Sequence, residues 1–172
     1  MRRVTSPTRK RAPPEVTSRR QNGSVETPTS VSGYEISTDK RRLDIDTVFH
    51  FLSDESYWAI GIPRDVVARS IENSLCFGVY QGTTQVGFAR IVTDKATFAL
   101  LADVFIVEAH RGKGLSKWLM REVMAHPDLQ GLRRLLLLTS DAHSLYAQFG
   151  FSAIDNAWRF MEVLHPDVYK RN

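Results

Sequence analysis

Residues 107–116 read VEAHRGKGLS, and this stretch decides the fold. An almost continuous apolar run precedes it over residues 100–107, interrupted only by Asp103. Apolar residues follow at positions 115, 118, 119, 120, 123 and 124. That spacing is typical of a helix, so the sequence predicts a strand that turns directly into a helix.

The predicted turn has the features of an anion site. A helix begins with backbone N–H groups that lack intrahelical partners, and the positive end of its dipole lies behind them. Gly112 and Gly114 allow close approach of the backbone and a positive φ. Arg111 and Lys113 add positive charge, and the pattern leaves open whether they contact a phosphate or are only solvated. The stretch is neither a P-loop nor a complete dinucleotide fingerprint.

Two further elements follow in the sequence. Residues 135–139, LLLLT, predict a second apolar strand. Residues 142–151, AHSLYAQFGF, predict a short helix that ends at Gly150, since glycine is the preferred residue just after a helix.

This order of elements resembles the GNAT superfamily of N-acetyltransferases. The family's motif for the coenzyme A pyrophosphate, [QR]-x-x-G-x-[GA], is matched by Arg111, Gly114 and Ser116, with serine in place of glycine or alanine. The second motif, Tyr-x-x-x-Gly-Phe, is matched by Tyr146, Gly150 and Phe151. Many members have an asparagine seven residues before that tyrosine, where this chain has Thr139.

The resemblance implies a mixed α/β fold: a mostly antiparallel sheet flanked by helices, with its fourth and fifth strands parallel and splayed apart. It also implies acetyl-coenzyme A as acetyl donor and an amine as acceptor. The cofactor-binding residues it implies are Phe105, Ile106 and Val107, whose backbone would pair with pantetheine, then Arg111, Gly112, Lys113, Gly114, Leu115, Ser116 and Lys117 around the pyrophosphate, and Thr139.

Two residues are candidates for catalysis. By the resemblance, Tyr146 is the general acid that protonates the departing thiolate, and the alternative is that it only packs beside Leu145 and Phe149. Asp103 interrupts an apolar strand, where a carboxylate is costly unless it is paired or hydrated. It is either the base or an acid that holds a water, or else a structural partner of an arginine such as Arg90.

The acceptor is expected at the loop that contains Tyr57, Trp58 and Arg64. Two adjacent large aromatic residues in a loop are unusual, because loops are normally polar. One ring would pack into the core, and the other, with Arg64, would shape a pocket for a small amine or a substrate with an acidic tail. The alternative is simple anchoring of the loop.

The remaining elements are read from periodicity and turn signals. Strands are expected at 34–37, 77–80, 86–92, 97–107 and 159–163, with a turn at Gln81-Gly82. Helices are expected from a cap at Asp46 through Leu52, and at 64–73.

Composition supports one enzyme domain behind a basic tail. The net charge of +4 is concentrated in residues 1–33, which carry +5 and leave −1 for residues 34–172. The tail is rich in proline, serine and threonine and has no aromatic residue, so it is expected to be disordered. A nucleic-acid or acidic-surface tether and a transit peptide are its alternatives.

Other features limit the function classes. No apolar run approaches about 18 residues, so no membrane span is expected. The single cysteine, Cys76, fits a reducing compartment and a cytoplasmic location, and as part of an apolar run it is expected to be a buried thiol. No metal-ligand spacing is present.

No Ser/His/Asp or Cys/His arrangement is recognisable, so direct transfer within a ternary complex is favoured over a covalent intermediate. The leading prediction is an N-acetyltransferase that acts on a small-molecule or protein amine. Whether the chain forms a homodimer is left open. A non-catalytic acyl-coenzyme A-binding module is the alternative. Nucleic-acid binding would depend on the tail alone and is not expected.

Overall fold

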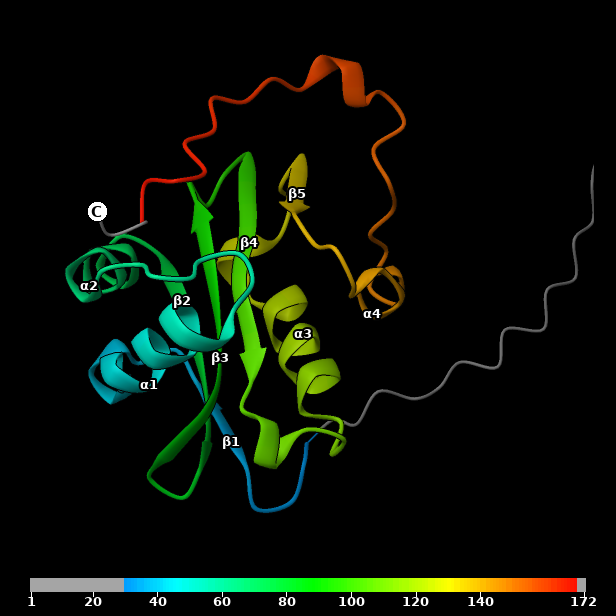
Figure 1. Cartoon of the computed structure of the whole chain (residues 1–172). Helices are drawn as coiled ribbons and strands as arrows, with labels where there is room; N and C mark the ends of the chain where they lie inside the picture. Colours follow the sequence, from blue (N-terminus) through cyan, green and yellow to red (C-terminus); the bar gives the residue numbers. More distant parts are fainter. Residues whose placement is uncertain (1–29, 170–172) are drawn as a thin grey trace, which may run out of the picture.

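The structure is a computed structural model that describes residues 30–169, and Figure 1 shows its course. Its sheet has five strands in the order β1-β2-β3-β4-β5. Their bounds are β1 Glu35–Ser37, β2 Leu75–Gln81, β3 Thr84–Thr93, β4 Phe98–Ile106 and β5 Arg134–Leu137. The first four strands are antiparallel neighbours, and β5 runs parallel to β4. The predicted mixed sheet with parallel fourth and fifth strands is confirmed.

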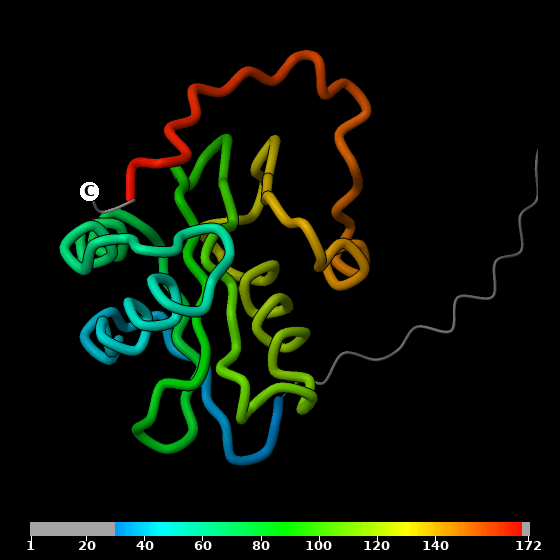
Figure 2. The backbone as a smooth tube through the Cα atoms, viewed as in Figure 1, coloured from blue at the N-terminus to red at the C-terminus, as the bar shows by residue number. Residues whose placement is uncertain are grey.

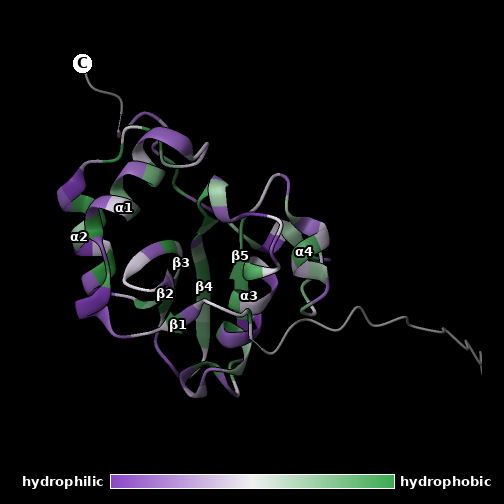
Figure 3. Ribbon diagram, turned by 90° about the horizontal axis from the view of Figure 1, so that it is seen from below, coloured by the Kyte–Doolittle hydropathy of each residue, from purple (hydrophilic) through white to green (hydrophobic). Residues whose placement is uncertain are grey.

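Helices cover both faces of the sheet (Figure 1). Their bounds are α1 Ile45–His50, continued by the π-helical turn η2 Phe51–Glu55, then α2 Arg64–Glu72, α3 Leu115–Ala125 and α4 His143–Ala147. One apolar cluster lies between the sheet and α3, and a second lies between the sheet and the α1–α2 pair. Hydrophobic residues accordingly concentrate along the central strands in Figure 3, while the outer side of α2 is hydrophilic.

The N-cap of the first helix lies two residues earlier than predicted. Asp44, and not Asp46, is the N-cap, because its carboxylate accepts hydrogen bonds from the backbone N–H groups of Asp46 and Thr47. Asp46 instead lies in the first turn. An acidic cap and an acidic first turn both complement the helix dipole, so the sequence allowed either start.

A bulge interrupts β4 at Asp103. Phe88 of β3 pairs with Phe105, but Arg90 pairs with Ala102, so β4 has one extra residue between the two pairs. Asp103 has a φ of 53°, in the left-handed region that aspartate tolerates better than most residues. Such a bulge bends and twists its strand.

The bulge lies where β4 and β5 part. Pairing of the two strands ends at Leu101 and Leu137, and the following residues of β4 have no β5 partner. The strands therefore open toward the turn that leads into α3 (Figure 1). This is the splay that the family resemblance implied.

The C-terminal segment differs from prediction. The strand expected at 159–163 is absent: a short 3-10 turn at Ala157–Arg159 is followed by irregular chain. The segment leaves α4 and runs beyond the upper ends of the strands toward α2, as the tube in Figure 2 shows. Apolar side chains such as Trp158 and Met161 are exposed along it. A strand requires a hydrogen-bonded neighbour, and this segment has none here.

Three further expectations concerned the cysteine, membrane-spanning helices and the N-terminal tail. Cys76 is buried, and this burial raises the pKa of its thiol to about 11, as expected of an inert core cysteine. Within residues 30–169, no helix is long and apolar enough to cross a membrane. Nearly all of the predicted disordered tail, residues 1–29, lies outside the described residues.

Candidate active site

A cavity of about 490 Å³ lies where β4 and β5 separate. Residues from three parts of the chain line it: the loop before α2, the bulged part of β4, and the segment from the end of β5 into α4. They include Tyr57, Trp58, Asp103, Thr139 and Tyr146. Five residues that the sequence assigned to catalysis, acceptor and cofactor thus meet in one place.

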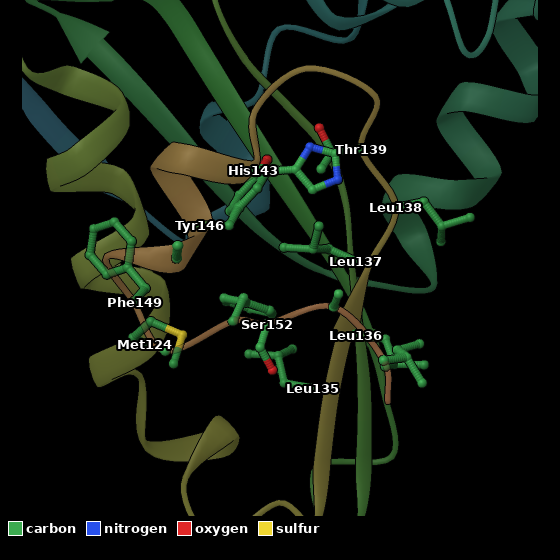
Figure 4. Close-up of a pocket in the computed structure, with 15 residues that line it drawn as sticks. Met124, Leu135, Leu136, Leu137, Leu138, Thr139, His143, Tyr146, Phe149 and Ser152 are labelled. Atoms are coloured by element: carbon green, nitrogen blue, oxygen red, sulfur yellow. The ribbon is translucent and has the colours of Figure 1, made fainter. Parts of the chain in front are cut away.

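Tyr146 lies between this cavity and a neighbouring one. The second cavity, of about 670 Å³, is bounded by β5, α4 and the first residues of the C-terminal segment, and Figure 4 shows Tyr146 beside Thr139 and Leu137 in it. Tyr146 is 9% exposed, and its ring meets that of Phe151 edge to face. Burial, followed by the nearby Tyr57 and Asp141, raises the pKa of Tyr146 to about 12. The phenol is therefore a stable proton donor at neutral pH.

Asp103 is anchored on both carboxylate oxygens. Oδ2 accepts a 2.6 Å hydrogen bond from Nε of Arg90, and Oδ1 accepts a 3.2 Å bond from the indole N–H of Trp58. The ion pair between Asp103 and an arginine, which the sequence left open as an alternative, is therefore present in the structure. A carboxylate has about four lone-pair sites, so these two bonds leave acceptor capacity toward the cavity.

The Arg90–Asp103 pair should contribute to stability. Its side chains are only 17% and 11% exposed. Replacing Asp103 by Asn keeps a residue that tolerates a positive φ but leaves the guanidinium without its counter-charge. We expect a loss of about 1–3 kcal/mol in the free energy of unfolding, measured by urea denaturation.

Asp46→Asn is the matched control for this substitution. It breaks an ion pair with Arg64 whose side chains are 53% and 61% exposed, and exposed pairs contribute about 0–1 kcal/mol. Equal losses in the two variants would contradict a structural role for the Arg90–Asp103 pair.

The N-terminus of α3 is open. Gly114 is its N-cap with a φ of 80°, and no side chain caps the helix. The N–H of Trp118 bonds to the carbonyl of Gly114, so the N–H groups of the three preceding residues lie ahead of the first intrahelical bond. Gly112 also has a positive φ, and a Cβ there would meet nothing within 4 Å. This free space beside outward N–H groups fits a diphosphate.

The two basic residues of the turn are engaged within the protein. Nε of Arg111 donates to the backbone carbonyl of Ile106 at 2.9 Å. Nζ of Lys113 donates to the hydroxyl of Tyr34 at 3.0 Å, and that hydroxyl also contacts His110. Arg111 thus ties the turn to the end of β4, and Lys113 ties it to the segment before β1.

The residues at the end of β4, Phe105 to Val107, differ in the backbone groups that they can offer to a ligand. The N–H of Val107 is already bonded to the carbonyl of Val86. The carbonyl of Ile106 faces Arg111, and the ring of Phe105 is buried against Phe51, with 3.9 Å between ring centroids. Ile106 pairs with Gly87 of β3, but its carbonyl is bonded to Arg111.

The acceptor loop contacts both sides of the cleft. Trp58 reaches Asp103 on β4, and the hydroxyl of Tyr57 accepts a 3.0 Å hydrogen bond from the N–H of Ser140, after β5. Arg64 is elsewhere: it pairs with Asp46 at 2.6 Å and does not line the cavity. The structure thus brings the two aromatic residues to the cleft without the arginine.

Asp141 is a charged residue of the cavity wall that the sequence did not single out. Asp141 lines the cavity and lies close enough to Tyr146 to contribute to its raised pKa. Its only sequence signal was a polar Thr-Ser-Asp step between an apolar strand and the helix that carries Tyr146.

Comparisons with known proteins agree with this geometry. Residues 72–153 match the family described as acetyltransferase (GNAT) domain. A Gibberella zeae protein named "Putative acetyltransferase FG08082" is 34% identical over 137 residues, which cover 67% of this chain and 76% of that protein. The crystal structure of a Xanthomonas campestris protein of the GNAT family is 48% identical, with a TM-score of 0.80, over 83% of this chain and all of that one.

A more distant GNAT acetyltransferase from Elizabethkingia anophelis, solved with acetyl-CoA bound, shares the fold. It is 13% identical with a TM-score of 0.55, over 72% of this chain and 79% of its own. Fold, cleft and relatives together define an acyltransferase. The chain belongs to the GNAT family of acetyltransferases.

Proposed function

We propose that this enzyme transfers the acetyl group of acetyl-coenzyme A directly to a primary amine held in the 490 Å³ cavity. The observation that carries the proposal is the uncapped N-terminus of α3, with its two left-handed glycines, at the open end of the parted strands. The Elizabethkingia anophelis relative, which binds acetyl-CoA on the same fold, supports the choice of donor.

The residues present fit the donor. Backbone N–H groups from Gly112 to Lys117 would hold its diphosphate, and the backbone of Phe105 to Val107 would border the pantetheine chain. Thr139 would add a polar contact, since its hydroxyl lies at the cavity wall and accepts a 3.0 Å hydrogen bond from the N–H of Ala142. Bound acetyl-coenzyme A supplies an activated thioester carbonyl.

Tyr146 is the proposed general acid. The amine nitrogen forms a bond to the acetyl carbon, the carbon–sulfur bond breaks, and the phenol of Tyr146 gives its proton to the leaving sulfur. The position of Tyr146 in the cavity wall supports this role. Its raised pKa means that the phenol carries its proton at neutral pH.

Asp103 is the proposed proton acceptor. A lysine-like amine has a pKa of about 10.4, so it must lose a proton to attack. The remaining lone pairs of the Asp103 carboxylate can hold a water through which this proton passes to the carboxylate and then to solvent, while Arg90 and Trp58 fix the carboxylate's orientation. The tyrosine regains its proton from solvent, and the net reaction releases one proton per ammonium consumed.

Thiol release from acetyl-coenzyme A, in the presence of simple primary amines, tests the activity. We expect release that depends on both the amine and the enzyme. The assay has a low background because the only cysteine of the chain is buried. Tight binding of acetyl-coenzyme A without amine-dependent release would instead favour the non-catalytic acyl-coenzyme A-binding module.

A further inference from the structure

The cavity that meets the acceptor loop has a largely apolar wall. Leu100, Leu101, Ala102 and Val104 of β4 line one side, and Leu138, just after β5, lines the other. Removing apolar surface from water is the main driving force for binding a hydrophobic group. A sugar or another strongly polar acceptor would gain little from such a wall.

The charged residues of the cavity wall are both acidic. Asp103 and Asp141 contribute carboxylates, and no lysine or arginine is among the residues of the described chain that line it. The guanidinium of Arg90 is bonded to Asp103 and to the hydroxyl of Ser74. A second acidic group on an acceptor would meet carboxylates without a cation to pair with.

Two aromatic rings complete the wall. Tyr57 and Trp58 lie edge to face, with 4.9 Å between centroids, and they are 56% and 41% exposed. Each is held by a hydrogen bond at its polar end: the hydroxyl of Tyr57 accepts from the N–H of Ser140, and the indole N–H of Trp58 donates to Asp103. Aromatic faces attract ammonium groups, and the attraction grows where water is excluded.

From these three features we infer that the acceptor is a small hydrophobic primary amine, alkyl or arylalkyl, without a carboxylate or phosphate. The inference deepens the proposed function and rests on it. The ammonium would lie between the carboxylates and the aromatic rings, with the hydrocarbon against the leucine wall. Of the two acceptors that the sequence left open, the small amine and the substrate with an acidic tail, the structure favours the first.

Matched pairs of acceptors test the inference. Phenethylamine and phenylalanine differ by one carboxylate next to the amine, and hexylamine and 6-aminohexanoate differ by one at the far end of the chain. We expect kcat/KM to be about 30-fold or more higher for the amine of each pair, because the acid brings a like charge to an acidic cavity. Equal values, or higher values for the acids, would overturn the inference.

A charge added to the wall should reverse the preference. Leu138 lines the cavity and is 80% exposed, so Leu138→Arg should fold normally and should raise kcat/KM for the acids relative to their amines. Leu164→Arg, at a residue that is 66% exposed on the C-terminal segment, is the matched control and should leave the ratio unchanged. An unchanged ratio in Leu138→Arg would count against the acidic wall as its source.

Binding separates this inference from the proposed function. Isothermal titration of the same four compounds into the enzyme saturated with coenzyme A does not require turnover. If the amines bind more tightly than the acids but none is acetylated, the proposed activity fails and the inference about the cavity stands. If acetylation occurs without preference, the activity stands and the inference fails.

Discussion

Replacing Tyr146 by Phe is expected to lower kcat by about 100-fold or more, because a positioned general acid typically contributes 10²–10⁴-fold. The substitution removes one hydroxyl from a largely buried ring and leaves its packing on Phe151 in place. Binding of acetyl-coenzyme A should therefore be unchanged. Steady-state kinetics with a saturating amine, combined with titration of the donor, would separate the two effects.

Tyr80→Phe is the matched control. Tyr80 is also a buried tyrosine whose pKa is raised by burial, but it lies on β2 and does not line the cavity. It should keep the full kcat. If Tyr146→Phe matched this control, Tyr146 would be a packing residue, as the alternative reading of the sequence had it.

The raised pKa of Tyr146 has its own signature. A free tyrosine ionises near pH 10. With a pKa of about 12, the phenol of Tyr146 is still protonated there. kcat should thus show no decline from this group up to about pH 10. The pKa of Tyr146 is higher in the folded protein than in the unfolded chain. The contribution of the neutral phenol to the free energy of unfolding is therefore complete below about pH 10 and is lost as the pH rises toward 12. The Tyr146→Phe variant should lose less stability over that window.

Ser116→Glu should have opposite effects on stability and on donor binding. Residue 116 is the second residue of α3, where a carboxylate interacts favourably with the helix dipole by about 0.3–1 kcal/mol. The same carboxylate would compete with a diphosphate for the free N–H groups. We expect a Tm equal to or above that of the parent, with Kd for acetyl-coenzyme A raised by about 10–100-fold because of like-charge repulsion.

Ala96→Glu makes the same change of charge in an exposed turn at the other end of β4 and is the control. It should leave Kd unchanged. If Ser116→Glu bound the donor as tightly as this control, the helix N-terminus would not be the diphosphate site.

Local patterns predicted the central part of the fold well. The run from Leu100 to Ser116 and the segment from Leu135 to Phe151 each contain their own signals, in apolar periodicity, glycine position and turn residues. These signals do not depend on distant parts of the chain. The strands β4 and β5 and the helix that follows each of them are therefore found as expected, whereas the parallel pairing of the two strands was implied by the family resemblance.

Expectations that depended on distant contacts were harder to make. The bulge at Asp103 arises from pairing with β3, and nothing in the local sequence marks the extra residue. Asp44 and Asp46 are the same residue type, so either could cap the helix. Which of them is the N-cap follows from where the chain enters the helix. Residues 159–163 have the pattern of a strand, but no neighbouring strand pairs with them in the structure.

The residues of the site show the same division between local signals and distant contacts. Tyr146 was assigned because it occupies a position of the family motif, and Trp58 because two adjacent large aromatic residues in a loop are unusual; both line the cavity. The partners of Asp103 could be narrowed to an arginine such as Arg90, but the bond to Trp58 joins residues 45 positions apart. Arg64 was assigned to the acceptor from its place in the sequence, and only the three-dimensional contact with Asp46 shows that it lies outside the cavity wall.

Titration of the ¹⁵N-labelled protein with coenzyme A, followed by the amide resonances of residues 112–117, tests the central claim most directly. The free N–H groups at the start of α3 should show the largest shifts, and the shifts should saturate. Pantetheine, which lacks the diphosphate, should bind about 100-fold more weakly and leave those resonances almost unmoved, because the charged hydrogen bonds are lost. If millimolar coenzyme A left the amides of Gly112, Gly114 and Ser116 unshifted, the account would be contradicted.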